Sequence, residues 1–212
     1  MPAAAATGPD LPAGGGFLPH RLPAGTELHR IHWAERDPVF FGPKPGFPPA
    51  NRFDAPAGEY RTFYAAERFE GAFVETVLRD PRRRLVAPAN VAARAWTAVA
   101  LRRDAVLAKL FDEGLRWHGV DGSISATDDY GPPRAVALAL FSRFPGLDGI
   151  AYRSRHNNGL LCYAVFDRVA ADDLVPGPTV ALSGRMDMAE RVVREHGGAF
   201  DRSAAVPPPA AD

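Results

Sequence analysis

A chain of 212 residues, 46% of them hydrophobic and 24% charged, is long enough to bury one core of an ordinary globular domain. Its 25 basic and 25 acidic residues cancel, which argues against a nucleic-acid backbone binder, because such proteins carry an excess of Lys and Arg. One cysteine, Cys162, excludes an internal disulfide and a cysteine-based metal cage, and no apolar run approaches the ~18 residues that span a bilayer.

The two ends of the chain have the composition of unstructured segments. Residues 1–25 are rich in Ala, Pro and Gly, and we expect them to form a flexible arm, with the fold beginning at Thr26. This arm lacks the basic start and continuous apolar core of a secretory signal, so a cytoplasmic location is expected. We expect residues 26–200 to form a single domain and residues 201–212 to form a disordered tail.

The first half of the domain predicts a strand, a long loop, a second strand and a helix. Residues 28–33 alternate as in a strand, with Arg30 on the face of Leu28. Residues 37–58 are rich in proline and glycine, and we expect this loop to form one wall of a cleft. Residues 61–66 predict a short buried strand. Residues 67–79 predict a helix whose apolar stripe leaves Glu75 on its flank.

The second half alternates short strands with two helices. Asp128 or Asp129 can cap a helix that continues through an almost entirely apolar stretch, residues 135–144, so this helix should be well buried. Residues 112–125 suggest a loop. The remaining expected strands are residues 94–101, 106–111, 150–152, 160–166 and 179–182, followed by a last amphipathic helix from Met186 to Gly197-Gly198. This pattern indicates a mixed α/β (α+β) fold.

Several ordered motifs resemble the RES domain family, which is named for an arginine, a glutamate and a serine. Each motif alone is weak, but their common order from about Thr26 to Arg168 makes the resemblance fairly specific. The motifs are Leu28-His29-Arg30-Ile31, Asn51-Arg52-Phe53-Asp54, Phe63-Tyr64-Ala65-Ala66, Glu70-Gly71-Ala72-Phe73-Val74-Glu75 and Gly149-Ile150-Ala151-Tyr152-Arg153-Ser154-Arg155.

This resemblance implies both a fold and an activity. It implies the fold of ADP-ribosyltransferases, with two small sheets around a nicotinamide cleft. It implies an NAD-consuming toxin, with NAD as substrate, usually neutralised by a helix-turn-helix antitoxin. No metal is expected, because the six histidines show no ligand spacing beyond His29 and His32 and acidic partners are not clustered near them. The family also includes phosphorolytic enzymes. The turn at Ala50-Asn51-Arg52-Phe53-Asp54 departs from the family's more common Gly-Gly-Arg-Trp-Asn form, which leaves the detailed role of Arg52 open.

Cleaving NAD at the nicotinamide bond requires a carboxylate near the anomeric carbon, because positive charge develops on the ribose as the bond breaks. Glu75 is the candidate, and its alternative is a surface glutamate paired with Arg79 four residues later. Arg30 and Arg52 are candidates to hold the pyrophosphate or orient the ribose. Their alternatives are a solvated edge-strand arginine for Arg30, and a solvated loop residue or a partner of Asp54 for Arg52.

Three further residues complete the candidate site. Tyr64 could stack on nicotinamide or bond the ribose, or it could be an ordinary core tyrosine. Ser154 would bond the ribose or fix Glu75, and it has no evident base that would make it a nucleophile. Arg155, with Arg153 and His156, could hold phosphate, or all three could lie in a solvated loop.

Three functions remain open at this point. The leading one is NAD cleavage with inorganic phosphate as acceptor (an NAD phosphorylase) or with water (an NAD glycohydrolase). The second is an ADP-ribosyltransferase that modifies a macromolecule, and the third is a non-catalytic module that binds NAD or a partner. Neither nucleic-acid nor membrane binding is expected. The oligomeric state, a homodimer included, is left open.

Overall fold

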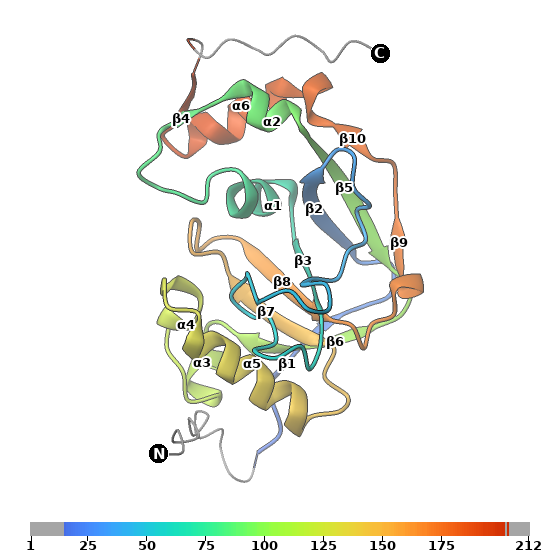
Figure 1. The fold of residues 1–212 in the computed structure, drawn as a ribbon. Helices are drawn as coiled ribbons and strands as arrows, with labels where there is room; N and C mark the ends of the chain where they lie inside the picture. The colour runs from blue at the N-terminus through green and yellow to red at the C-terminus, as the bar shows by residue number, and fades with distance from the viewer. Residues whose placement is uncertain (1–14, 202, 204–212) are drawn as a thin grey trace.

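This computed structural model describes residues 15–201 and 203. The fold is built on one nine-stranded sheet (Figure 1). The strand order is β1-β6-β7-β8-β3-β2-β5-β10, with β9 also paired to β5, and every pairing except the parallel β6–β7 is antiparallel. The strands are β1 (Pro19–Leu22), β2 (Glu27–Trp33), β3 (Thr62–Ala66), β5 (Arg94–Leu101), β6 (Ala105–Leu110), β7 (Gly149–Arg153), β8 (Leu161–Phe166), β9 (Leu174–Pro176) and β10 (Val180–Ala181).

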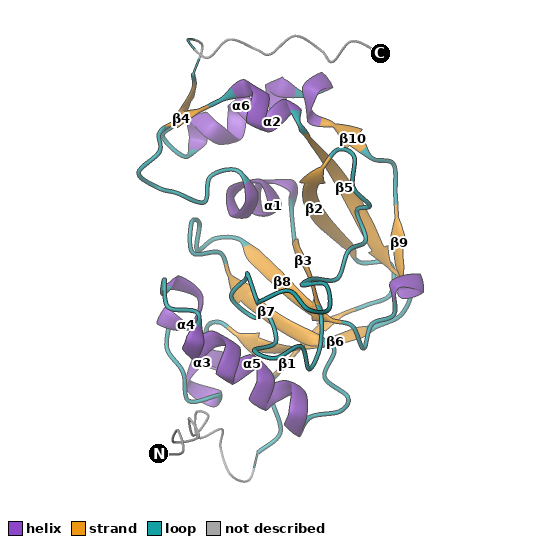
Figure 2. Ribbon diagram, viewed as in Figure 1, coloured by secondary structure: helices purple, strands orange, loops and turns teal. Residues whose placement is uncertain are grey.

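Helices and a small second sheet cover this curled sheet (Figure 2). The helices α3, α4 and α5 lie over β6, β7 and β8, whereas α1, α2 and α6 gather at the end near β2 and β5. The helices are α1 (Phe69–Thr76), α2 (Pro88–Ala92), α3 (Glu113–Trp117), α4 (Ser123–Ala126), α5 (Gly131–Arg143) and α6 (Met186–Glu195), and β4 (Leu85–Val86) pairs with β11 (Ala199–Phe200). Among the described residues no helix is long and apolar enough to cross a membrane.

Two hydrophobic cores lie on opposite faces of the sheet, as the alternation of side chains along a strand requires. The core on the helix-covered face includes Ile31, Phe73, Leu140 and Val192. The core on the other face includes Leu28, Phe63 and residues of β5, β6, β7 and β8. Consecutive residues of one strand therefore enter different cores, which explains why β3 reads as a nearly continuous apolar run.

The sheet divides into two halves at β2 and β3, and this division positions the candidate site. The two strands are paired at a single register position, His29 opposite Ala66. Beyond that point they separate, β2 continuing along β5 and β3 continuing along β8. The two small sheets expected from the family resemblance are therefore two halves of one sheet that are joined at this position.

Most sequence-based boundaries agree with the structure, and three expectations were wrong. Residues 19–22 form β1 against β6, so the expected flexible arm of residues 1–25 extends too far. Residues 112–125 contain α3 and α4, not only a loop. Helix α5 buries only one face, through residues such as Val136 and Leu140. Residues 1–14 and nearly all of the tail from residue 202 onward lie outside the described residues.

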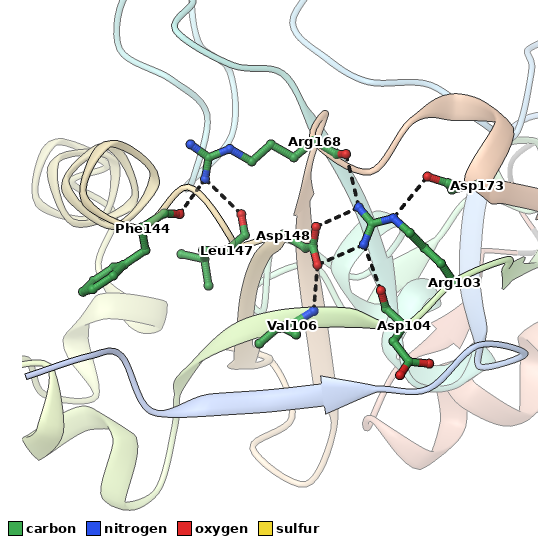
Figure 3. A network of polar contacts seen from close by, with 8 residues as sticks. All are labelled: Arg103, Asp104, Val106, Phe144, Leu147, Asp148, Arg168 and Asp173. Carbon is green, nitrogen blue, oxygen red and sulfur yellow. Dashed lines mark hydrogen bonds and ion pairs between the residues drawn. The ribbon is translucent and has the colours of Figure 1, made fainter.

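A polar network fastens the start of β7 to the neighbouring chain segments (Figure 3). Arg103 donates to both carboxylate oxygens of Asp148, at 2.8 and 3.2 Å, and to Asp173 at 3.2 Å. The Asp148 carboxylate also accepts the amide of Val106 at 2.9 Å, and Arg168 donates to the carbonyls of Phe144 and Leu147. The network fixes one end of β7, and the candidate residue Ser154 follows the other end.

Candidate active site

A cavity of about 400 Å³ opens where β2 and β3 separate, beside α1 on the helix-covered face of the sheet. Five of the six residues that the sequence suggested for the site, all except Ser154, line this cavity directly. Its charged and aromatic lining residues are His29, Arg30, Trp33, Arg52, Tyr64, Glu75, Arg79, Arg94, Tyr130, Tyr152, Arg155 and His156.

Glu75 reaches the cavity because α1 lies unusually close to the sheet. A Cβ added at Gly71 would come within 2.9 Å of the Ala66 Cβ, so glycine permits this approach one helical turn before Glu75. Glu75 is half-buried, and one carboxylate oxygen accepts a hydrogen bond of 2.6 Å from the Ser154 hydroxyl. No ion pair between Glu75 and Arg79 occurs within the described residues, so the surface-pair alternative does not apply.

Ser154 is fully buried directly behind the Glu75 carboxylate. Its oxygen accepts the backbone N–H groups of His156 and Asn157, each at 3.2 Å. A hydroxyl has one proton, and with both N–H groups bonded to the oxygen that proton is committed to Glu75. This contact is the geometry required by one of the two roles expected from the sequence, in which Ser154 fixes Glu75.

Arg52 is buried beside the cavity rather than solvated. Its guanidinium donates to the carbonyl of Thr127 at 2.7 Å and lies 4.7 Å from the centre of the Tyr130 ring. Burial lowers the pKa of Arg52, while the neighbouring Tyr130 opposes that shift. Asp54 is not its partner, so both alternatives for Arg52 are excluded. The guanidinium is held by one carbonyl and one ring, and it has donors left for a ligand.

Tyr64 holds the turn that carries Arg52. Its hydroxyl accepts the backbone N–H of Phe53 at 3.0 Å and donates to Asp54 at 3.0 Å. The other carboxylate oxygen of Asp54 accepts the amides of Ala50 and Asn51. Burial, followed by the nearby Asp54, raises the pKa of Tyr64 well above its ordinary value, so its proton remains in place to make this bond. The role of Asp54 in holding this turn was not predicted from the sequence.

Arg30 fills the gap between the two halves of the sheet. It is on an inner strand, and its guanidinium donates to the carbonyls of Phe40 and Tyr64, at 3.2 and 3.3 Å, while lying 4.8 Å from the centre of the Phe63 ring. Burial lowers its pKa to about 10, which leaves the side chain charged at neutral pH. The carbonyl of Tyr64 is free to accept because β2 no longer pairs with β3 there. The solvated-edge alternative is excluded.

The arginines around Ser154 are paired differently. Arg155 lines the cavity and pairs with Asp128 at 2.7 Å, whereas Arg153 pairs with Asp112 at 3.3 Å and is not among the lining residues. Burial lowers the pKa of His156, and Glu75 opposes that shift. In the described part of the chain, Arg79 makes no hydrogen bond or ion pair, although it lines the cavity.

Several lining residues were not expected from the sequence. Tyr130 lies under Arg52, and Tyr152 contacts Phe53 with their ring centroids 4.9 Å apart. Arg94 lies 4.2 Å from the centre of the Trp33 ring, across the β2–β5 pairing. The alternation of β2 and β7 could have placed Trp33 and Tyr152 on the cavity face, but no local signal marks Tyr130 or Arg94.

The cavity therefore combines one fixed carboxylate with several cations and aromatic rings. Such a site can accept an anionic ligand through its arginines, stack a planar ring on its tyrosines and place one negative charge beside an electron-deficient carbon. The Cys162 thiol also lines the cavity, but burial raises its pKa well above the ordinary value, so it stays protonated. Among the described residues there is no group of three or more His, Cys, Asp and Glu suited to a metal ion.

Comparison with known proteins gives one family and a similar solved structure. The family model described as "RES domain" matches residues 20–184. The toxin–antitoxin complex of M. tuberculosis MbcT and MbcA contains a similar chain, with a TM-score of 0.62 and 16% sequence identity, covering 80% of this chain and 90% of that one. This likeness concerns the fold. No curated protein matches.

Proposed function

The chain belongs to the RES domain family, and on that premise we propose that it degrades NAD by cleaving the bond between nicotinamide and ribose. The observation that carries the proposal is the 2.6 Å hydrogen bond by which Ser154 fixes the Glu75 carboxylate inside an arginine-lined cavity. A carboxylate held in this way, without an ion pair, keeps its charge available for a cationic transition state.

In the proposed reaction, the C–N bond breaks with its electron pair going to nicotinamide, which leaves as a neutral molecule. The ribose becomes oxocarbenium-like, and Glu75 stabilises it more strongly than the ground state, which is the condition for catalysis. Related carbocationic centres in glycosidases are stabilised by carboxylates in the same way. Arg52 and Arg30 hold the central pyrophosphate of the dinucleotide or orient the ribose, and Tyr130 or Tyr152 offers a face for the nicotinamide ring.

The acceptor in this proposal is inorganic phosphate, with water as the competing nucleophile. An oxygen of phosphate or water forms the new bond to the anomeric carbon and its proton passes to solvent, giving a phosphorylated ADP-ribose or ADP-ribose. Arg155 and Arg79 on the cavity wall supply the positive charge that a bound phosphate requires. Holding the nucleophile beside the sugar converts a bimolecular encounter into an oriented one.

We further propose that the protein acts as the toxin of a toxin–antitoxin pair. The similar solved chain comes from such a complex, and the family membership points the same way. An antitoxin, of helix-turn-helix type as the family resemblance implies, would then be a partner protein. Growth arrest on expression, relieved by a neighbouring gene's product, is the result that supports this role.

The test of the catalytic proposal compares two isosteric changes on one helix. Glu75→Gln removes the charge that stabilises the transition state, and we expect NAD turnover to fall about a hundredfold or more. Glu70→Gln is the matched control, because Glu70 pairs with Arg191 at 2.9 Å and does not line the cavity. Mass spectrometry of the products with and without phosphate identifies the acceptor in the same assay.

The outcomes are distinct. Near-normal NAD turnover by a folded Glu75→Gln protein contradicts the role of the carboxylate. Equal losses for both glutamine variants contradict a specific role for the cavity. ADP-ribose formed at the same rate in both buffers means hydrolysis, and label transferred to protein means ADP-ribosyl transfer.

A further inference from the structure

The loop between α4 and α5, residues 127–130, touches two arginines of the cavity. The carbonyl of Thr127 accepts a hydrogen bond from Arg52, and the ring of Tyr130 lies under the same guanidinium. Asp128 lies between them in the sequence, and its carboxylate accepts a hydrogen bond of 2.7 Å from Arg155, which lines the cavity. The loop therefore places a negative charge against one arginine of the cavity lining.

The Asp128–Arg155 pair is asymmetric in its surroundings. The side chain of Asp128 is 91% exposed, whereas that of Arg155 is 24% exposed and lines the cavity. The carboxylate thus approaches Arg155 from solvent and occupies one donor, Nη1, of an arginine that lines the cavity. Within the described residues, the Asp128 carboxylate makes no hydrogen bond other than the one to Arg155, whereas the carbonyl of Thr127 is bonded independently by Arg52.

We propose that Asp128 is an anionic gate: its carboxylate occupies the place of a phosphate group on Arg155, and an incoming phosphate displaces it. The inference rests on the proposed function, in which a phosphate group must enter this cavity, either as free phosphate or as the diphosphate of the dinucleotide. The gate weakens the binding of anions that contact Arg155 alone. Anions that contact several cations of the cavity at once still bind.

Displacement is physically easy. An exposed ion pair contributes little to stability, because water and salt screen both charges. A phosphate group carries more charge than a carboxylate and has three strong acceptor oxygens, so it can bond the fork of Arg155 and a second cation together. Arg79 lines the same cavity and, in the described part of the chain, has no partner of its own. Rotation of the Asp128 side chain leaves the Thr127–Arg52 contact intact.

The chain contains a second Asp–Arg pair that serves as a matched control, and its arginine, Arg153, lies two residues before Arg155. Asp112 pairs with Arg153 at 3.3 Å, its side chain is 50% exposed, and Arg153 is not among the residues that line the cavity. Each aspartate therefore pairs with an arginine that adjoins Ser154 in the sequence, but only the partner of Asp128 lines the cavity. Asparagine at either position keeps the shape and removes the charge.

The experiment measures binding by calorimetry at constant ionic strength, with inorganic phosphate in one arm and ADP-ribose in the other. We expect Asp128→Asn to tighten binding up to about fivefold, the scale of one exposed ion pair, and Asp112→Asn to leave it unchanged. If only phosphate binds more tightly, the displacing group is the acceptor phosphate. If only ADP-ribose binds more tightly, the displacing group is the diphosphate of the dinucleotide.

Unchanged affinity for both ligands in Asp128→Asn overturns the gate, and so does equal tightening by Asp112→Asn. A double-mutant cycle gives a second measure: the effect of Asp128→Asn should vanish in an Arg155→Ala background, and its persistence there contradicts the proposal. Binding is measured without NAD cleavage, so this result and that of Glu75→Gln can fail independently.

Discussion

Tyr60 and Tyr64 both bond the backbone of Phe53, but only Tyr64 borders the cavity. Tyr60 donates to the carbonyl of Phe53, which also accepts the Thr62 hydroxyl, so losing Tyr60 leaves that carbonyl a partner. Tyr64 accepts the N–H of Phe53 and donates to the buried Asp54. The two hydroxyls thus allow a comparison: both stabilise the turn at Phe53, but only the Tyr64 hydroxyl also lies beside the cavity and Arg52.

We predict that Tyr64→Phe lowers the free energy of unfolding by about 1–3 kcal/mol, because the N–H of Phe53 loses its partner, and that Tyr60→Phe lowers it by about 0.5–1.5 kcal/mol, because the carbonyl of Phe53 keeps Thr62. Only Tyr64→Phe should also raise KM for NAD, about tenfold, because the turn that carries Arg52 loosens. Thermal unfolding and steady-state kinetics of both variants check this. Equal kinetics for the two variants would assign Tyr64 a structural role alone.

At the scale of the element, the position of α1 decides where Glu75 lies. The helix approaches the sheet at Gly71, where an added Cβ meets the Ala66 Cβ at 2.9 Å and the Leu160 Cβ at 3.7 Å. Ala66 and Leu160 both belong to the core on the helix-covered face, which has little freedom to move. Glu75 follows one turn later, so a displacement of the helix at Gly71 carries directly to the carboxylate.

We predict that Gly71→Ala lowers NAD turnover about tenfold, because small shifts of a reacting group have large effects on rate. Gly146→Ala is the control, since a Cβ at Gly146 meets nothing within 4 Å. Turnover measured at saturating NAD distinguishes the two variants. A Gly71→Ala protein with unchanged turnover would show that the close approach of α1 does not matter for the reaction.

The elements themselves could be predicted from the sequence where a period was strong. The alternation of residues 94–101 and the stripe around Phe73 gave β5 and α1, and the order of the motifs pointed to Arg52, Glu75 and Ser154. Contacts between distant segments could not be predicted. The bond from Arg52 to Thr127 joins residues 75 apart, and the Asp128–Arg155 pair joins residues 27 apart, and neither leaves a periodic signal.

At the scale of the molecule, four histidines share one electrostatic property. Burial lowers the pKa of each below the ordinary value of 6.5, with charged neighbours as smaller influences on three of them and backbone hydrogen bonds as smaller influences on His118. The residues are His20, His29, His118 and His156. Between pH 6.5 and the lower pKa values of the folded protein, the unfolded chain therefore binds more protons than the folded one. The free energy of unfolding contributed by these histidines is thus lost as pH falls through this range.

We predict that the free energy of unfolding decreases from about pH 7.5 to about pH 5.5, measured by denaturant titration at several pH values. His118→Gln should reduce the slope, because burial lowers the pKa of His118 and its Nε2 accepts the amide of Leu18, which requires the neutral ring. A slope unchanged by this substitution would contradict the contribution assigned to His118.

The hydrogen bond between Ser154 and Glu75 spans 79 residues of sequence, and this has a consequence for biosynthesis. A ribosome releases the chain from its N-terminus, so α1 and the Arg52 turn emerge well before β7 and β8. Strand β3 must wait for β8, its antiparallel partner, before it is paired along its length. A nascent chain arrested before Ser154 thus carries the carboxylate without the group that orients it, and the cavity is completed only late in translation.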